Sequence, residues 1–187
     1  AILLEKEIVH FDLKSENILY NTQTQQPVII DFGLSFSSKK LNNIIDRVDD
    51  NSNDNDDSDD SDDSDDSESS LKKIFYIYAP KYYIWPIEVH LINYVLHKAS
   101  GELSEDDVIT VVSSYMDNDA MFDIVSNNFK DDYKNAAINF FKQYVGMSNN
   151  TVIGMLIKFC NTWDSYALNI LYLKLLGLVF PDGIVKN

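Results

Sequence analysis

Cysteine is almost absent from this sequence of 187 residues, which contains only Cys160. A single cysteine excludes a disulfide framework, and the apolar residues around it favour a small buried side chain over a reactive thiol. Long apolar runs are also missing. The longest, residues 167–180, is interrupted by Asn169 and Lys174 and is too short to span a bilayer. No signal peptide is visible, so we expect a protein of the reducing cell interior without a membrane partner.

Basic residues are scarce as well. Lys and Arg number 15 against 30 Asp and Glu, and the formal net charge is −15. Residues 49–70 hold 12 of the acidic side chains and no basic one, and the rest of the chain carries 18 acidic and 15 basic side chains, a net charge of −3. This near balance argues against a nucleic-acid partner, which would require a basic face. Residues 49–70 also lack any apolar side chain, so we predict that they form a disordered acidic insertion.

The remaining sequence is apolar enough for one domain with a sizeable core. Its pattern predicts an α+β fold that is mainly α, with a short hairpin early in the chain and helices after it. The last helix is apolar nearly all round, which predicts that it is buried. Ser104 and Asp107 precede an apolar run and resemble a helix-capping arrangement. The predicted strands are residues 8–9, 18–20 and 28–30, and the predicted helices include residues 85–97, 135–145 and 164–176.

One short segment carries several chemically useful side chains at fixed offsets. It reads His10-Phe11-Asp12-Leu13-Lys14-Ser15-Glu16-Asn17, and Asp31-Phe32-Gly33 begins fourteen residues after Asn17. Each part alone would indicate an ordinary turn or a solvated charge. Together they resemble the catalytic loop H-R-D-L-x-x-x-N and the D-F-G motif of eukaryotic-type protein kinases. The resemblance implies a kinase C-lobe, with the predicted hairpin between the loop and D-F-G.

The resemblance also assigns roles in phosphoryl transfer, which depends on a positioned nucleophile and on neutralised phosphate charge. By analogy, Asp12 orients the attacking hydroxyl and accepts its proton, and Lys14 balances the charge of the transferring phosphate. Asn17 and Asp31 would bind the Mg²⁺ of ATP, since this hard cation prefers oxygen ligands. Leu19 would pack beneath the adenine ring of ATP.

Four further residues have structural roles in the family. His10 and Phe32 would stack in the core, and Gly33 would permit backbone angles that other residues resist beside the metal ligand. Asp164 opens a segment, residues 164–169, that resembles the start of the central C-lobe helix, where the family's aspartate binds the backbone of the catalytic loop. An ordinary helix N-cap is the alternative for Asp164.

The same loop indicates a substrate class. Lys14 resembles the lysine of serine/threonine kinases, so the expected partner is a protein substrate with a Ser or Thr hydroxyl. Two segments resemble the A-P-E that ends the activation segment, namely Ala79-Pro80-Lys81 and Pro86-Ile87-Glu88. The sequence leaves both open.

The chain departs from the family pattern in several ways. Phe11 stands where the family has an arginine that pairs with a phosphorylated activation segment, so activity is predicted not to depend on that phosphorylation, which phosphatase treatment would test. The acidic run lies inside this segment. It is either a solvated insertion, or a segment that competes as a pseudosubstrate or attracts basic substrates. Residues 89–160 would be a family-specific helical insertion.

The layout is similar to kinases of large DNA viruses, which would place the protein in the host cytoplasm or the virion.

The resemblance covers about residues 1–88 and 160–180, one side of a two-lobed enzyme. The N-lobe, with its Gly-rich loop and strand lysine, is absent, so we expect this partial kinase domain to need an N-lobe encoded upstream and to bind ATP poorly alone. One alternative is a catalytically dead C-lobe remnant, or pseudokinase, that acts as a protein-interaction module. Another is an acidic protein whose Asp/Ser tract binds basic partners.

Overall fold

A computed structural model describes residues 2–50, 67–98, 101–118, 122 and 125–179. The fold is α+β and mostly helical, as the sequence predicts, and it contains two small antiparallel sheets. In chain order, the helices and strands are α1 (Ile2–Glu5), β1 (Ile8–Val9), the 3₁₀ turn η1 (Ser15–Asn17), β2 (Ile18–Asn21), β3 (Gln26–Ile29), β4 (Phe36–Ser37), α2 (Ser38–Asp50), α3 (Ser67–Ile74), α4 (Ile87–His97), α5 (Glu105–Asn118), α6 (Asn127–Phe141), η3 (Lys142–Tyr144), α7 (Asn149–Ile157), η4 (Cys160–Thr162) and α8 (Trp163–Val179).

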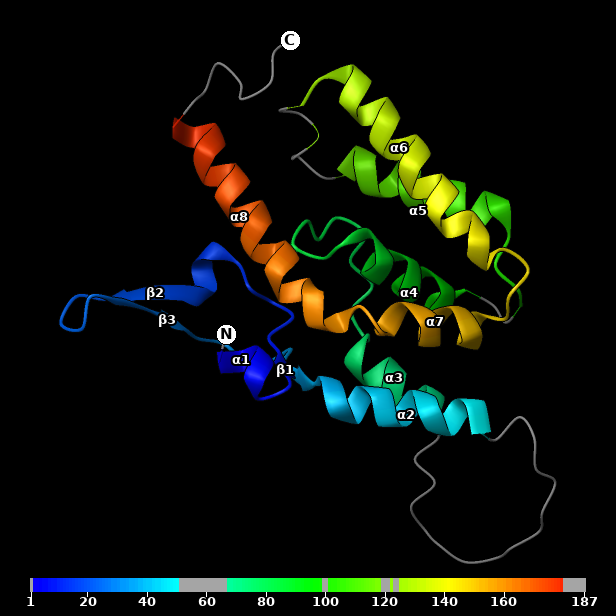
Figure 1. Cartoon of the computed structure of the whole chain (residues 1–187), viewed down its shortest axis with the longest axis horizontal. Helices are drawn as coiled ribbons and strands as arrows, with labels where there is room; N and C mark the ends of the chain where they lie inside the picture. The colour runs from blue at the N-terminus through cyan, green and yellow to red at the C-terminus, as the bar shows by residue number, and fades with distance from the viewer. Residues whose placement is uncertain (1, 51–66, 99–100, 119–121, 123–124, 180–187) are drawn as a thin grey trace, which may run out of the picture.

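Both sheets belong to the part of the chain that contains the motifs. Strands β2 and β3 form the predicted hairpin, with Leu19 opposite Val28, and the hairpin extends away from the helical body (Figure 1). Strand β1 pairs with β4, so Val9 lies opposite Phe36. Because β1 and β4 flank residues 10–35, their pairing brings both ends of that segment together. The loop after β1 and the loop before β4 therefore lie side by side.

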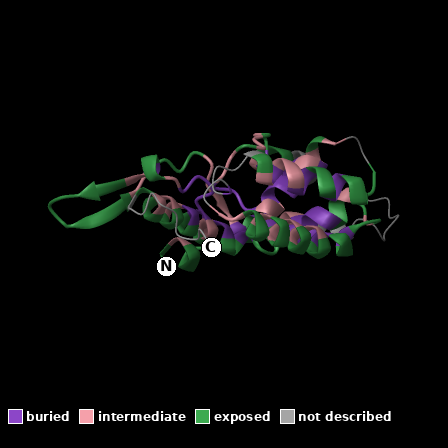
Figure 2. Ribbon diagram, turned by 90° about the horizontal axis from the view of Figure 1, so that it is seen from above, coloured by how far each residue is buried: buried purple, intermediate pink, exposed green. Residues whose placement is uncertain are grey.

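The core is centred on α4, whose apolar side chains point in nearly every direction. Val89, Leu91 and Ile92 of α4 are fully buried, and α7 packs along this helix. Figure 2 shows the buried residues gathered in the helical body and the β2–β3 hairpin almost wholly exposed. Residues 89–160 are largely helical where they are described, and α4 and α7 contribute to the same core that holds the motif loop.

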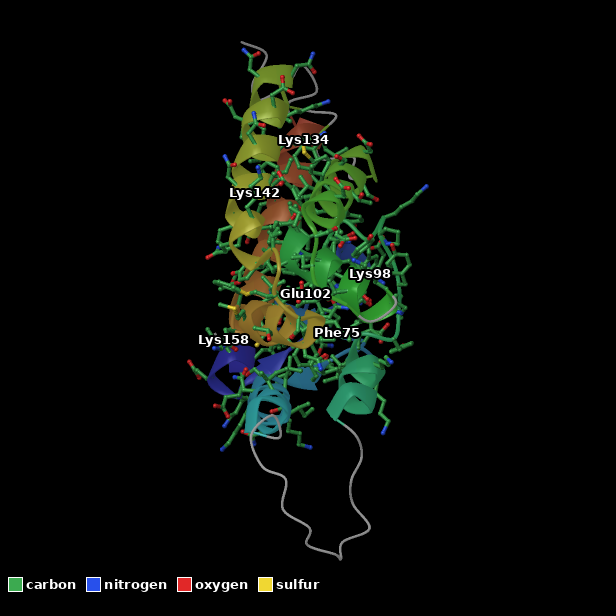
Figure 3. The ribbon with its side chains drawn as sticks, turned by 90° about the vertical axis from the view of Figure 1, so that its right-hand side faces the viewer. Phe75, Lys98, Glu102, Lys134, Lys142 and Lys158 are labelled. Carbon is green, nitrogen blue, oxygen red and sulfur yellow. The ribbon has the colours of Figure 1, made fainter. Side chains whose placement is uncertain are left out.

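Helices α5 and α6 pack against each other at one side of this core. Lys142 lies just after α6 (Figure 3). Its Nζ forms an ion pair of 2.8 Å with Glu105 Oε1 of α5. Helix α6 begins earlier than residue 135, where the sequence predicted it. The reason is a cap, because the Ser126 hydroxyl accepts a hydrogen bond from Phe129 N at 3.2 Å.

The prediction that the last helix is buried all round is wrong. The first half of α8 is buried, and Trp163 and Ala167 are 2% and 3% exposed. In the second half, Tyr172, Leu175 and Leu178 are 64%, 56% and 79% exposed, because this part of α8 extends past the core (Figure 1). An apolar sequence predicts burial only where another element packs against it.

Two other expectations concern particular segments. Cys160 is buried, as predicted, and burial raises the pKa of its thiol to about 11, which keeps it protonated.

Most of the acidic run predicted to be disordered, residues 51–66, lies outside the described part of the chain. Helix α2 continues to Asp50 and α3 begins at Ser67, so both ends of the 49–70 run are helical. No helix in the described part is long and apolar enough to cross a membrane.

The capping arrangement at Ser104 is present. Ser104 N donates to Asp107 Oδ2 at 2.9 Å, and Asp107 N donates to the Ser104 hydroxyl at 3.2 Å, so each residue satisfies a backbone amide of the other. Burial alone would raise the pKa of the Asp107 carboxyl. Hydrogen bonds from Lys98 and Ser104 outweigh burial and hold this pKa well below its usual range.

Replacing Asp107 should therefore change how stability depends on pH. A carboxyl whose pKa is lowered by folding stabilises the protein above its unfolded pKa of about 4, and this contribution is lost as the pH falls towards the folded value. We predict that Asp107→Asn lowers the free energy of unfolding at neutral pH by about 1 kcal/mol, with a smaller difference from the parent below pH ~3. Urea unfolding at several pH values measures this, and Asp106→Asn at the exposed neighbouring position is the control. An equal loss at every pH would contradict the prediction.

Candidate active site

The backbone of the motif loop is held by one carboxylate from the far end of the chain. His10 N donates to Asp164 Oδ2 at 2.7 Å, and Phe11 N donates to Asp164 Oδ1 at 3.0 Å. Asp164 is the second residue of α8, so it does not occupy the capping position that was its alternative role. Both oxygens of one side chain thus bind two successive amides that are 154 and 153 residues away. This is the contact that the kinase resemblance implies for Asp164.

Phe11 is the centre of an aromatic cluster. Its ring lies 4.8 Å from that of Trp85 in a stacked arrangement, and 5.5 Å from that of Trp163. Phe36 and Phe75 meet it edge-on, with centroids 5.3 and 5.7 Å away. Phe11 is 4% exposed. The residue that stands in place of the family's arginine is therefore a core residue, and it leaves no cation at this position to bind a phosphate.

The carbonyl of Phe11 has a partner in the same cluster. Trp85 Nε1 donates to Phe11 O at 2.8 Å, and this bond ties the segment before α4 to the motif loop. Phe11 has a φ of 66°, in the left-handed region that is costly for a bulky side chain. Bonds on both sides of the residue, to Asp164 and to Trp85, hold it in this conformation.

His10 connects the motif loop to the D-F-G segment. It is fully buried, and its Nε2 lies 3.0 Å from the carbonyl oxygen of Ile30. Its Nδ1 accepts a hydrogen bond from Asp12 N at 3.3 Å, so Nε2 carries the proton and donates to Ile30. The ring of Phe32 meets His10 edge-on at 4.8 Å, although Phe32 is 47% exposed. The expected contact between these two rings is present, but Phe32 is not a core residue in the described structure.

The carboxylate of Asp12 gathers the polar side chains of the loop. Lys14 Nζ lies 3.0 Å from Asp12 Oδ2, and Asn17 Nδ2 donates to the same oxygen at 2.9 Å. Asn17 Nδ2 also donates to the backbone oxygen of Asp12 at 2.9 Å. Asp12 and Asn17 are 5% and 4% exposed, which restricts both side chains to this arrangement. Three of the residues singled out in the sequence thus form one hydrogen-bonded group.

A fourth member of the group was missed by sequence reasoning. The hydroxyl of Tyr82 donates a short hydrogen bond to Asp12 Oδ1, and Lys14 Nζ lies 3.4 Å from the same hydroxyl. Burial, and then the hydrogen bond to Asp12, raise the pKa of Tyr82, so its phenol is neutral. Tyr82 is 70 residues from Asp12 and belongs to no motif, so nothing in the sequence pattern points to it.

Asn17 and Asp31 are the proposed metal ligands, and their donor atoms suit a hard cation. Because Asn17 uses its amide nitrogen towards Asp12, its carbonyl oxygen is the atom that remains for a ligand. Ile30 N donates to Asn17 O at 2.9 Å, which joins the end of the hairpin to the loop just before Asp31. Asp31 is exposed and has a φ of 61°, a strained conformation of the kind found at ligand sites. Mg²⁺ bound with a nucleotide needs only one or two protein ligands, because phosphate oxygens and water supply the others.

Gly33 does not adopt the unusual backbone angles that the sequence analysis predicted for it. The positive φ belongs to Asp31, and Gly33 has an ordinary φ. What Gly33 provides is space, because a Cβ built there would lie 3.2 Å from Asp31 Oδ1, which is closer than usual contact. Gly33 N also lies 3.3 Å from Asp31 Oδ1 and donates a hydrogen bond to it. Within the described residues, no three His, Cys, Asp or Glu side chains form a metal-binding group of their own.

Leu19 lies on the exposed hairpin rather than beside Asp12. It is 52% exposed, and its cross-strand partner Val28 is 42% exposed. Directly opposed residues point to the same face of a hairpin, so these two form a small apolar surface. That surface is available to an apolar ring, as the role beneath adenine requires.

The two candidate ends of the activation segment differ in structure. Ala79-Pro80-Lys81 forms a turn, in which Tyr82 N donates to Ala79 O at 3.0 Å, and Lys81 is exposed. Pro86 lies at the N-cap of α4, and burial raises the pKa of the Glu88 carboxyl in the first helical turn. Pro86 of the second candidate is buried, whereas Lys81 of the first is exposed.

The chain matches no family model, and comparison with curated proteins and with solved structures finds no match. Its function is therefore inferred from the motifs and from the geometry around Asp12.

Removing the Asp164 carboxylate should release the motif loop. We predict that Asp164→Ala lowers the free energy of unfolding by roughly 3 kcal/mol, because two buried amides lose a charged acceptor. Hydrogen exchange should accelerate most at His10 and Phe11. Asp132→Ala, at an exposed position of α6, is the matched control and should have little effect. Unchanged exchange at both amides would show that Asp164 does not hold the loop.

An arginine at position 11, as in the kinase loop that this segment resembles, should destabilise the protein. We predict that Phe11→Arg costs at least about 3 kcal/mol of stability, because it removes a buried aromatic ring and brings an unpaired charge into the cluster. Thermal unfolding with circular dichroism measures the change. Phe129→Arg, at a position that is 50% exposed, is the control and should cost less than about 1 kcal/mol. Equal stability of Phe11→Arg and the parent would refute the structural role of Phe11.

Proposed function

We propose that this chain supplies the catalytic loop and the metal-binding side of a serine/threonine protein kinase, with a C-lobe-like fold. The observation that carries the proposal is the group around Asp12, whose Oδ2 is bonded by both Lys14 and Asn17. A carboxylate held by two positioned donors suits a general base, because its orientation is fixed before the substrate arrives. The Asp164 bonds to His10 and Phe11 support the proposal from the opposite end of the chain.

Each residue then has a part in phosphoryl transfer. Asp12 would orient the hydroxyl of a Ser or Thr in a protein substrate and accept its proton. Lys14, already 3.0 Å from Asp12, would place a positive charge beside the transferring phosphate. Asn17 and Asp31 would hold the Mg²⁺ that accompanies ATP, and Leu19 would contact the adenine. When bound, Mg²⁺·ATP supplies the phosphoryl group and part of the charge neutralisation.

The proposal includes a partner and a mode of regulation. ATP in this family lies between two lobes, so the proposed partner of this C-lobe is an N-lobe encoded upstream, and the reducing cytoplasm of a virus-infected cell or the virion is the proposed location. Phe11 is buried among aromatic rings, which supports activity that does not depend on phosphorylation of the activation segment. The acidic run would then serve as a solvated insertion.

A second candidate function is a protein-interaction module without catalysis, or pseudokinase. One observation favours it. The Tyr82 hydroxyl is hydrogen-bonded to Asp12 Oδ1, the carboxylate oxygen that Lys14 and Asn17 do not bind, so no oxygen of Asp12 is without a partner for a substrate hydroxyl. The two functions differ in a measurable way. An interaction module would bind partners without consuming ATP, whereas a kinase would transfer phosphate.

Two substitutions test the kinase proposal, in the full-length product of the gene that encodes this chain. Asp31→Ala should abolish Mg²⁺-dependent ATP binding, because it removes the carboxylate ligand. Asp12→Asn should keep ATP binding and lower the rate of phosphate transfer to a protein substrate by about 10²- to 10⁴-fold, because it removes the base. Titration calorimetry with and without EDTA measures binding, and radiolabelled ATP measures transfer.

The matched control is Asp106→Ala on the exposed face of α5, which should change neither quantity. Mg²⁺-dependent binding that survives Asp31→Ala would contradict the metal assignment. Transfer at an unchanged rate in Asp12→Asn would contradict the base assignment, and binding of partners without any transfer in the parent protein would favour the interaction module.

A further inference from the structure

Tyr82 occupies the position that an acceptor hydroxyl would need. An attacking hydroxyl has to lie within hydrogen-bond reach of its base. Asp12 Oδ2 already accepts bonds from Lys14 and Asn17, at 3.0 and 2.9 Å. Asp12 Oδ1 accepts its bond from the Tyr82 phenol, and Lys14 Nζ lies 3.4 Å from the phenol oxygen. The phenol therefore contacts both the proposed base and the proposed phosphate-binding cation.

The fold holds the Tyr82 ring in place independently of its hydroxyl. The ring meets Trp85 edge-on at 4.8 Å, and Trp85 is fixed in turn by its stacked contact with Phe11 and by its bond to Phe11 O. Tyr82 N also closes the turn that starts at Ala79. These contacts involve the ring and the backbone, so they would keep the side chain near Asp12 even without the bond from the hydroxyl.

We infer that Tyr82 is a phosphoryl acceptor within its own chain, modified in cis by the site around Asp12. The inference rests on the proposed kinase function and adds one tyrosine to its Ser/Thr acceptors. A hydroxyl that donates to a base, with the base oriented by a third group, is the arrangement of an activated nucleophile. Asn17 is the third group here, because its amide binds both the carboxylate and the backbone oxygen of Asp12.

The reaction balances with a nucleoside triphosphate as the phosphoryl donor. The Tyr82 oxygen forms a bond to the terminal phosphorus, and the bond from that phosphorus to the bridging oxygen breaks. The phenol proton passes to Asp12, and the nucleoside diphosphate leaves with the electron pair of the broken bond. The phosphate on Tyr82 then carries nearly two negative charges, which repel the carboxylate of Asp12. Because Tyr82 has a single hydroxyl, it accepts at most one phosphate per chain.

The test uses the full-length gene product, dephosphorylated and then incubated with Mg²⁺ and ATP. Mass spectrometry of its peptides should find phosphotyrosine at position 82, up to one phosphate per chain. The rate should not change when the protein is diluted, because donor site and acceptor belong to one molecule. Tyr82→Phe should abolish this phosphate, and Tyr83→Phe at the next residue should retain it. Dephosphorylated casein, added in parallel, reports transfer to Ser and Thr of another protein.

The outcomes separate this inference from the proposed function. Transfer to casein without phosphate on Tyr82 would overturn the inference and leave the kinase proposal standing. A rate of Tyr82 modification that rises with protein concentration would also overturn it, because the acceptor would then belong to another copy. Absence of transfer to both acceptors would overturn the inference and the kinase proposal together. Asp12→Asn should lower the rates of both transfers by about 10²- to 10⁴-fold.

Discussion

The two hydrogen bonds from the His10 and Phe11 amides to the Asp164 carboxylate connect the two ends of the described chain. These bonds fix the backbone from which Asp12 projects, and Asp12 in turn positions Lys14 and Asn17. A charged acceptor with two buried donors is among the stronger interactions that a protein interior offers. The order of the loop therefore depends on α8, which begins one residue before Asp164.

The aromatic cluster around Phe11 also holds the motif loop in position. Phe11 lies between Trp85, which precedes α4, and Trp163, which begins α8. Burial of these rings stabilises the contact between the motif loop and the start of α8, which the Asp164 bonds also hold. The cluster also brings Tyr82 to Asp12, because Tyr82 packs on Trp85. The apolar ring at position 11, where the kinase loop that this segment resembles has an arginine, thus contributes both to the packing of the loop and to the placement of Tyr82 beside the proposed base.

Much of the local structure could be predicted from the sequence. The hairpin follows from two short β-branched runs, and the start of α5 follows from the spacing of Ser104 and Asp107, because strand pairing and capping depend on nearby residues. Predictions about packing were less accurate. The second half of α8 is exposed although it is apolar. At the local level, Gly33 leaves space beside the Asp31 carboxylate, and it does not have the positive φ that was predicted.

The sequence by itself determined which side chains are candidates for the proposed phosphoryl transfer, because Asp12, Lys14, Asn17 and Asp31 stand at the offsets of a known motif within one short stretch of chain. It also determined that Phe11 cannot bind a phosphate, since an aromatic ring carries no charge. Only the tertiary structure decided that Asp12 Oδ1 is bonded by Tyr82, from a segment 70 residues away. The reason is physical: offsets along a chain constrain neighbours in sequence, whereas contacts between distant segments arise from the packing of the whole core.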